Sequence, residues 1–196
     1  MPSAESQSYR IAPAQAAAST AAESLSKPNS RIFMPKIAVD AMGGDHAPAI
    51  IVEGALLAAQ ELNVQVVLVG EKQSVEQELS RRGHSSKLEI VPASEVVAMH
   101  EAPTAALRKK DSSMKVAFEM MKRGEVDAVV SAGNSGAMMA TGMFVVGTLS
   151  QVARPAIMIV VPSLTHGTVI VDAGANVDCK PKHLVQFGFT IHEPIR

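Results

Sequence analysis

The sequence has little cysteine, few aromatic residues and no excess of charge of one sign. One cysteine in 196 residues, Cys179, excludes an internal disulfide and a multi-cysteine metal site, and fits a reducing compartment. With no tryptophan, one tyrosine and five phenylalanines, the chain can build little of a base-stacking surface. The 18 Lys and Arg nearly balance the 19 Asp and Glu, which argues against a general nucleic-acid binder. With 47% hydrophobic residues, the composition favours a globular chain with a core.

Long apolar segments are also scarce. The stretch between Asp127 and Arg154 is uncharged, but a turn at residues 133–136 would leave backbone groups unpaired in lipid. The apolar run at 155–164 is too short to cross a bilayer, and the N-terminus does not resemble a secretory signal. We therefore expect a cytoplasmic chain without a membrane span, with docking on a membrane surface left open.

Residues 1–35 differ from the rest in composition. They are rich in Ala and Ser and show no sustained periodicity, which predicts a disordered N-terminal extension. A transit peptide is a weaker interpretation because Glu5 and Glu23 interrupt the few basic residues. A third interpretation is that translation starts at Met34.

Strand and helix patterns alternate from Lys36 onward. We expect strands at 36–40, 64–70, 88–92, 126–131, 156–161 and 168–172, and helices at 48–62, 74–82, 111–123, 135–149 and from about 181. This order predicts an α/β fold with a mostly parallel sheet and helices on both faces. Because ligands bind beyond the carboxyl ends of such strands, the loops there are the candidates for chemistry.

The first such loop is DAMGGDHAP, at residues 40–48. Its glycines allow unusual backbone conformations and the close approach of a ligand. Asp45 as a cap of the following helix and His46 as an exposed loop residue are the alternatives. The loop supplies the candidate substrate-binding residues Asp40, Gly43, Gly44 and Asp45 and the candidate catalytic residue His46.

The second loop, SAGNSGA at 131–137, joins a strand to a helix. Small residues there expose N–H groups at the positive end of the helix dipole, which suits phosphate. The loop is neither a dinucleotide fingerprint nor a P-loop, and close helix packing would explain its glycines equally well. Its candidate phosphate-binding residues are Asn134, Ser135 and Gly136.

The third loop, VDAGANVDCKP at 171–181, ends at a predicted helix. Asp172 ends a strand and is a further candidate substrate-binding residue, and Asn176 can donate or accept. Lys180 adds positive charge beside the helix start, unless it is simply a solvated lysine. Cys179 is an acyl-carrying nucleophile only if a base lies nearby, and a packed, unreactive thiol is the favoured interpretation.

Residues 100–113 concentrate basic and hydroxyl side chains just before a helix. Asp111 or Ser112 is a plausible cap, and the basic residues are suited to gripping phosphate or steering an acidic partner. A solvated charged face is the alternative. The candidate binding residues are Arg108, Lys109, Ser112 and Ser113, with Lys110 beside them.

Four segments together resemble one family. VDAMGGDHAP (39–48), LRKKDSSM (107–114), SAGNSGA (131–137) and VDAGANVDCKP (171–181) are similar, in order and spacing, to PlsX, the bacterial phosphate acyltransferase family. The resemblance covers about 34–186 and implies an α/β/α sandwich related to isocitrate and isopropylmalate dehydrogenases and to phosphotransacetylase. It also implies a homodimer at the membrane surface, with no nucleotide or metal.

The resemblance further implies an activity. A long-chain acyl group passes from acyl carrier protein to inorganic phosphate, and the acyl phosphate goes on to a membrane glycerol-3-phosphate acyltransferase in phospholipid synthesis. Phosphate would be held by Ser112, Ser113, Asn134, Ser135 and Gly136, with Arg108 or Lys109 balancing its charge. The carbonyl would be polarised, or the leaving thiolate protonated, by His46, Asn176 or Lys180.

The chain is shorter than members of this family. We therefore expect a truncated acyltransferase domain at 36–186 and a divergent tail at 187–196 (FGFTIHEPIR), where Pro194 disfavours a helix. Two rival interpretations follow: an inactive fragment of such an enzyme, and a phosphotransacetylase-like enzyme acting on a small acyl-CoA.

Overall fold

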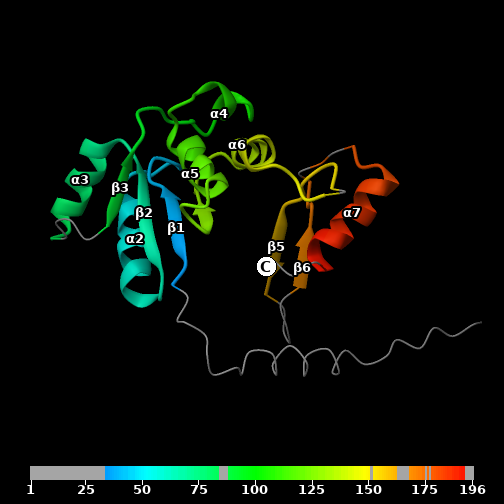
Figure 1. Cartoon of the computed structure of the whole chain (residues 1–196), viewed down its shortest axis with the longest axis horizontal. Coiled ribbons are helices and arrows are strands. Elements are labelled where there is room, and N and C mark those ends of the chain that lie inside the picture. Colours follow the sequence, from blue (N-terminus) through cyan, green and yellow to red (C-terminus); the bar gives the residue numbers. More distant parts are fainter. Residues whose placement is uncertain are drawn as a thin grey trace, which may run out of the picture. The chain divides into compact units, whose positions relative to one another are not determined.

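The computed structural model describes residues 34–83, 88–150, 152–162, 168–174, 176 and 178–192 (Figure 1). Contacts divide the chain into the units 1–33 and 34–196, and only the second is described below. The extension expected at 1–35 therefore lies outside the described residues, apart from Met34 and Pro35.

Four strands form a parallel sheet in the order β3-β2-β1-β4. They are β1 (Lys36–Asp40), β2 (Gln65–Gly70), β3 (Glu89–Pro92) and β4 (Ala128–Val130). The register places Val39 of β1 opposite Leu68 and Val130, its partners on the two sides. The carboxyl ends of β1 and β4 therefore lie next to each other, which brings the loops that follow them together.

Helices cover both faces of this sheet. Alternate residues of β2 point to opposite faces, so each face offers apolar side chains for a helix to pack against. Val66 and Leu68 pack against α2 (Ala49–Glu61) and α3 (Lys72–Arg81). Val67 and Val69 pack on the other side against Ala117 and Met120 of α5 (Ser113–Lys122). The predicted three-layer α/β/α fold is thus confirmed.

A third core cluster lies between α5 and the helices near the carboxyl edge. Its buried residues are Val97, Ala105, Ala106, Met114, Phe118 and Ala137. They come in part from α4 (Ala105–Arg108), where no helix was expected, and from α6 (Ser135–Thr141). The single helix expected at 135–149 is wrong in its second half: α6 passes into the π-helix η1 (Gly142–Val146) and ends at Gly147, whose φ is 103°.

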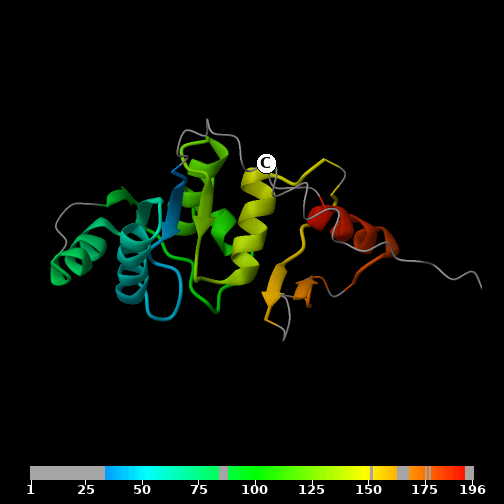
Figure 2. The same ribbon diagram turned by 90° about the horizontal axis from the view of Figure 1, so that it is seen from below.

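The last two strands do not belong to the parallel sheet. β5 (Met158–Val161) and β6 (Thr168–Val171) pair with each other in an antiparallel ribbon (Figure 2). Six residues separate them, fewer than the dozen or more that a parallel crossover needs.

The helix α7 (Pro181–His192) follows β6 and continues past residue 186, where we had expected divergent sequence to interrupt it. Phe187 is buried, which shows that the helix has an apolar contact at this point. Pro194 lies outside the described residues. Among the described helices, none is both long and apolar enough to cross a bilayer.

Candidate functional site

The loops after β1 and β4 are joined through a buried carboxylate. Asp40 is 1% exposed, and its Oδ2 accepts a hydrogen bond of 2.7 Å from the Ser131 hydroxyl. The Ser131 oxygen in turn accepts from the Gly133 N–H at 3.0 Å, while Asp40 Oδ1 accepts from the Met42 N–H at 3.2 Å. Asp40 therefore fixes the two loops against each other. A direct contact between Asp40 and substrate stays a prediction.

Glycines let these two loops meet backbone to backbone. A Cβ on Gly43 would lie 2.8 Å from Ser131 Oγ in the second loop, as well as 2.5 Å from Asp40 Oδ2 in its own loop. A Cβ on Gly44 would lie 3.0 Å from the Ala132 carbonyl oxygen. Gly44 also has a φ of 102°, a conformation that disfavours other residues. The packing of loop on loop thus accounts for both glycines.

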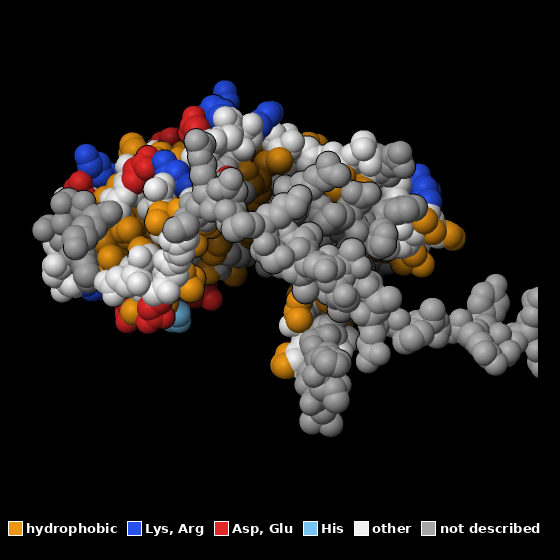
Figure 3. Space-filling model, turned by 60° about the horizontal axis from the view of Figure 1, so that its bottom comes forward, with side chains coloured by type: hydrophobic (Ala, Val, Ile, Leu, Met, Phe, Trp, Pro, Cys, Tyr) orange, Lys and Arg blue, Asp and Glu red, His pale blue; other side chains and the backbone are white. Residues whose placement is uncertain are grey.

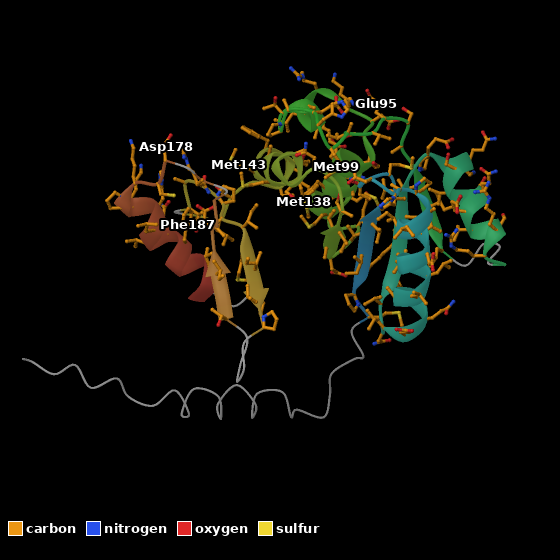
Figure 4. All side chains as sticks on the ribbon, turned by 180° about the vertical axis from the view of Figure 1, so that it is seen from behind. Glu95, Met99, Met138, Met143, Asp178 and Phe187 are labelled. Atoms are coloured by element: carbon orange, nitrogen blue, oxygen red, sulfur yellow. The ribbon has the colours of Figure 1, made fainter. Side chains whose placement is uncertain are left out.

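Asn134 connects the second loop to the segment between β3 and α4. Its side-chain oxygen accepts from the Ala137 N–H at 3.0 Å and so caps α6. Its amide nitrogen donates to the carbonyl oxygens of Met99 and Glu101, at 3.0 and 2.9 Å. Met99 and Glu95 are labelled on this segment in Figure 4. Both amide hydrogens are used, so Asn134 also shapes the site. A contact between Asn134 and phosphate stays a prediction.

The hydroxyl pair expected to bind phosphate is buried. Ser112 is the N-cap of α5, accepting from the Lys115 N–H and donating to the Lys109 carbonyl oxygen at 3.1 Å. Ser113 is 1% exposed, and its N–H donates to the Glu95 carbonyl oxygen. The capping interpretation of Ser112 is therefore confirmed.

The basic residues beside them divide into bound and exposed groups. Lys109 Nζ lies 2.6 Å from both Glu101 Oε2 and the Val96 carbonyl oxygen. Its hydrogen bond holds the pKa of Glu101 below the usual range. Arg108 and Lys110 are exposed, and on the face drawn in Figure 3 basic and acidic side chains lie beside each other.

Three candidates from the first two loops are exposed at this edge. Asp45 and His46 lie before α2, which begins without a side-chain cap, so the interpretation of Asp45 as its cap is wrong. Ser135, the first residue of α6, is also exposed. The neighbouring Gly136 is needed for packing, since a Cβ there would lie 3.0 Å from a Pro103 ring carbon.

The third loop is organised around Asp172, a non-glycine residue with a φ of 58°. Its Oδ1 accepts from Asn176 Nδ2 at 2.9 Å, and Asn176 Nδ2 also donates to the Pro155 carbonyl oxygen at 3.1 Å. Cys179 lies 3.6 Å from Asp172 Oδ2 and is exposed, not packed as expected. Partial desolvation of its sulfur and then the hydrogen bond and charge of Asp172 raise the thiol pKa, which disfavours a nucleophilic role.

The start of α7 contains a residue that the sequence analysis missed. His183 is 4% exposed, and its Nδ1 accepts from the Lys180 N–H at 3.1 Å. Burial and then the charges of Arg154, Lys182 and Lys180 lower its pKa, so the imidazole is neutral at neutral pH. Lys180 directly precedes α7, and His183 follows it by three residues. That spacing was the sequence signal from which this hydrogen bond could have been predicted.

The structure therefore brings together part of the predicted site. The segments 40–48, 94–113 and 131–137 are joined by hydrogen bonds and close backbone contacts. Within the described part of the chain, no hydrogen bond or ion pair connects Asn176 or Lys180 to His46. Nor does any group of three or more His, Cys, Asp and Glu side chains among these residues form a candidate metal site.

A parallel sheet between two helical layers, with its short glycine-bearing loops at the carboxyl edge, defines a class of α/β proteins. A phosphotransacetylase from Streptococcus pyogenes has this fold: its crystal structure matches with a TM-score of 0.61 at 14% identity, covering 79% of this chain and 51% of that chain. Residues 35–192 match the family described as "Fatty acid synthesis protein". The chain belongs to that family.

Curated relatives agree with this assignment. A phosphate acyltransferase from Geobacter sulfurreducens is 53% identical over 154 residues, which is 78% of this chain and 44% of the relative. One from Aquifex aeolicus is 49% identical over 161 residues, 81% of this chain and 48% of the relative. The resemblance drawn from the four motifs is thus confirmed, and the chain spans a little under half the length of these relatives.

Proposed function

We propose that this chain transfers a fatty acyl group from a thioester to inorganic phosphate. The observation that carries the proposal is the joining of the loops 40–48 and 131–137 through Asp40 and Ser131 in a chain about half identical to phosphate acyltransferases. This arrangement presents Asp45, His46 and Ser135 at one edge of the sheet, where α/β proteins bind their ligands.

The chemistry needs little from the protein beyond orientation and charge. A phosphate oxygen attacks the thioester carbonyl carbon, the C–O bond forms and the C–S bond breaks. The proton of hydrogen phosphate goes to the departing thiolate, so the products are an acyl phosphate and a thiol. We assign phosphate to the hydroxyl of Ser135 and the N–H groups of Ser135 and Gly136, with Arg108 balancing charge. His46, or Lys180 and Asn176 from the third loop, would polarise the carbonyl.

The donor we propose is acyl carrier protein, an acidic partner that the exposed Arg108 and Lys110 would attract. In the whole protein the acyl phosphate would then pass to a membrane glycerol-3-phosphate acyltransferase. Homodimer formation, a cytoplasmic location and peripheral docking on the membrane belong to the same proposal.

Donor comparison tests this function. The 196-residue chain is given palmitoyl-acyl carrier protein or acetyl-CoA, with and without phosphate, and acyl phosphate is trapped with hydroxylamine. We expect phosphate-dependent product from the palmitoyl donor, and a fall of about tenfold in kcat/KM for phosphate in S135A, since one hydrogen bond to a charged group is lost. The matched control is S80A, on the remote helix α3.

Three outcomes contradict the proposal. Product from acetyl-CoA in preference to the palmitoyl donor would assign a phosphotransacetylase-like activity. A folded chain that makes no acyl phosphate would be an inactive fragment. Equal kinetics in S135A and S80A would remove Ser135 from the phosphate site.

A further inference from the structure

A groove of about 440 Å³ lies between α4, α5 and η1. Both α4 and η1 pack against α5, so the groove is bounded by helices. Among the described residues, none from the loops 40–48, 131–137 and 171–181 lines it. Arg108 and Lys110, which we assigned to attracting the acyl donor, are not in its lining either. The groove is therefore a surface separate from the candidate site.

Apolar side chains from α4 and η1 form one part of the lining. They are Leu107, Phe144 and Val145. Phe144 is 63% exposed, whereas its neighbour Val145 packs against the buried cluster that contains Phe118. An aromatic ring left in water at the wall of a groove has a large apolar area to bury against a partner.

The charged part of the lining comes from one face of α5 and its end. Lys115, Glu119 and Lys122 follow one another at helical spacings of four and three residues, and Arg123 comes next. The Glu119 carboxylate lies 4.0 Å from both Lys115 Nζ and Arg123 Nη1, beyond hydrogen-bond distance. Arg123 donates to Glu125 at 2.6 Å, while Lys122 forms no ion pair within the described part of the chain. Three basic side chains thus face one carboxylate in this lining, so the groove attracts negative charge.

We propose that this groove docks an acidic amphipathic helix of a partner protein other than the acyl donor. A helix presents side chains three and four positions apart on one side, so its apolar residues would cover Phe144 while its carboxylates pair with Lys115 and Lys122. A concave surface between helices fits such a rod better than it fits the flat surface of a bilayer. The inference goes beyond the proposed function, because it concerns a second surface and a second partner.

Peptide binding tests the groove in the intact 196-residue chain. The probe is a fluorescein-labelled helical peptide with leucine at every third and fourth position and with alanine and glutamate elsewhere, and fluorescence anisotropy measures its Kd. We expect K122E to weaken binding about fivefold, since attraction at an exposed site becomes repulsion. F144S should weaken it about tenfold, from lost apolar burial. The matched control K72E reverses an exposed lysine on α3, away from the groove, and should bind as the unsubstituted chain does.

A charge exchange separates docking from a change in folding. A second peptide, with lysine in place of glutamate, should bind the unsubstituted chain poorly and K122E more tightly. Equal binding of the two peptides, or equal Kd values for K122E and K72E, would overturn the inference.

Two further measurements identify the occupant. Acyl phosphate formation from palmitoyl-acyl carrier protein should have the same kcat/KM in K122E as in K72E. A fall confined to K122E, or displacement of the peptide by acyl carrier protein, would assign the groove to the acyl donor and overturn the second partner. Sedimentation should show no self-association that F144S abolishes, because such a result would place another copy of this chain in the groove.

Discussion

At the residue scale, the side chain of Asn134 joins the start of α6 to the segment before α4. One side chain caps α6 and holds two carbonyl groups of the preceding segment, at Met99 and Glu101. We expect N134A to lower the free energy of unfolding by about 2–3 kcal/mol, from the lost cap and the two unpaired carbonyls. N134S keeps a capping oxygen and should lose about half as much. Urea denaturation measures both, and equal losses would show that the cap contributes nothing.

Cys179 gives a second prediction at this scale. After desolvation of the sulfur, the hydrogen bond and charge of Asp172 are the next causes that raise the thiol pKa. D172N should therefore lower that pKa and speed alkylation by iodoacetamide at pH 8. Asparagine tolerates a φ of 58° as aspartate does, which keeps the turn. D178N removes a weaker, purely electrostatic effect and should speed alkylation less. A slower reaction in D172N would contradict the assignment.

At the scale of the elements, two glycines, one in the loop after β1 and one within α2, should respond to substitution in opposite ways. Gly44 combines a φ of 102° with a close carbonyl oxygen, so we expect G44A to lose about 1–3 kcal/mol of stability. Gly54 lies within α2, where a Cβ would meet nothing within 4 Å, so G54A should gain about 0.5–1 kcal/mol. Chemical denaturation of the two variants checks the contrast. Similar effects of the same sign would show that conformation is not what distinguishes these positions.

The start of α7 depends on a neutral imidazole. The lowered pKa of His183 means that the unfolded chain binds this proton more tightly than the folded chain does. The contribution of His183 to the free energy of unfolding is therefore fully present above the unfolded pKa of about 6.5. It is lost as the pH falls from that value through the lower pKa of the folded chain. Protonation would also remove the acceptor for the Lys180 N–H.

Thermal melts between pH 5 and 8 test this contribution. Gln keeps an acceptor but does not titrate, so H183Q should show a flatter pH dependence than the unsubstituted chain. The control H46Q changes an exposed histidine and should keep the slope. An unchanged slope in H183Q would contradict the role of His183.

Sequence periodicity predicted elements better than it predicted their partners. Alternation of apolar runs with helices was enough for β1 to β4 and the helices that cover them, because apolar side chains of the central strand β2 are buried on both faces of the sheet. The antiparallel pairing of β5 and β6 was missed although the six-residue connection between them indicated it. The π-helix at Gly142–Val146 was not predicted from the sequence.

For the whole molecule, the motifs predicted which loops meet at the carboxyl edge of the sheet, but not the hydrogen bonds of all their residues. The sequence predicted that loops at the carboxyl edge meet, and 40–48 and 131–137 do. It did not predict that Asp40 and Asn134 would be occupied by contacts to other loops, since these depend on residues far away in the chain. The chain spans less than half the length of its curated relatives.

Phosphate binding to the 196-residue chain tests the central claim most directly. The claim is that the joined loops after β1 and β4 hold inorganic phosphate, and ³¹P line broadening on titration with the protein measures this without an acyl donor. We predict saturable broadening that S135A weakens several-fold and S80A leaves unchanged. Broadening that is absent from the folded chain, or equal in the two variants, would contradict the account.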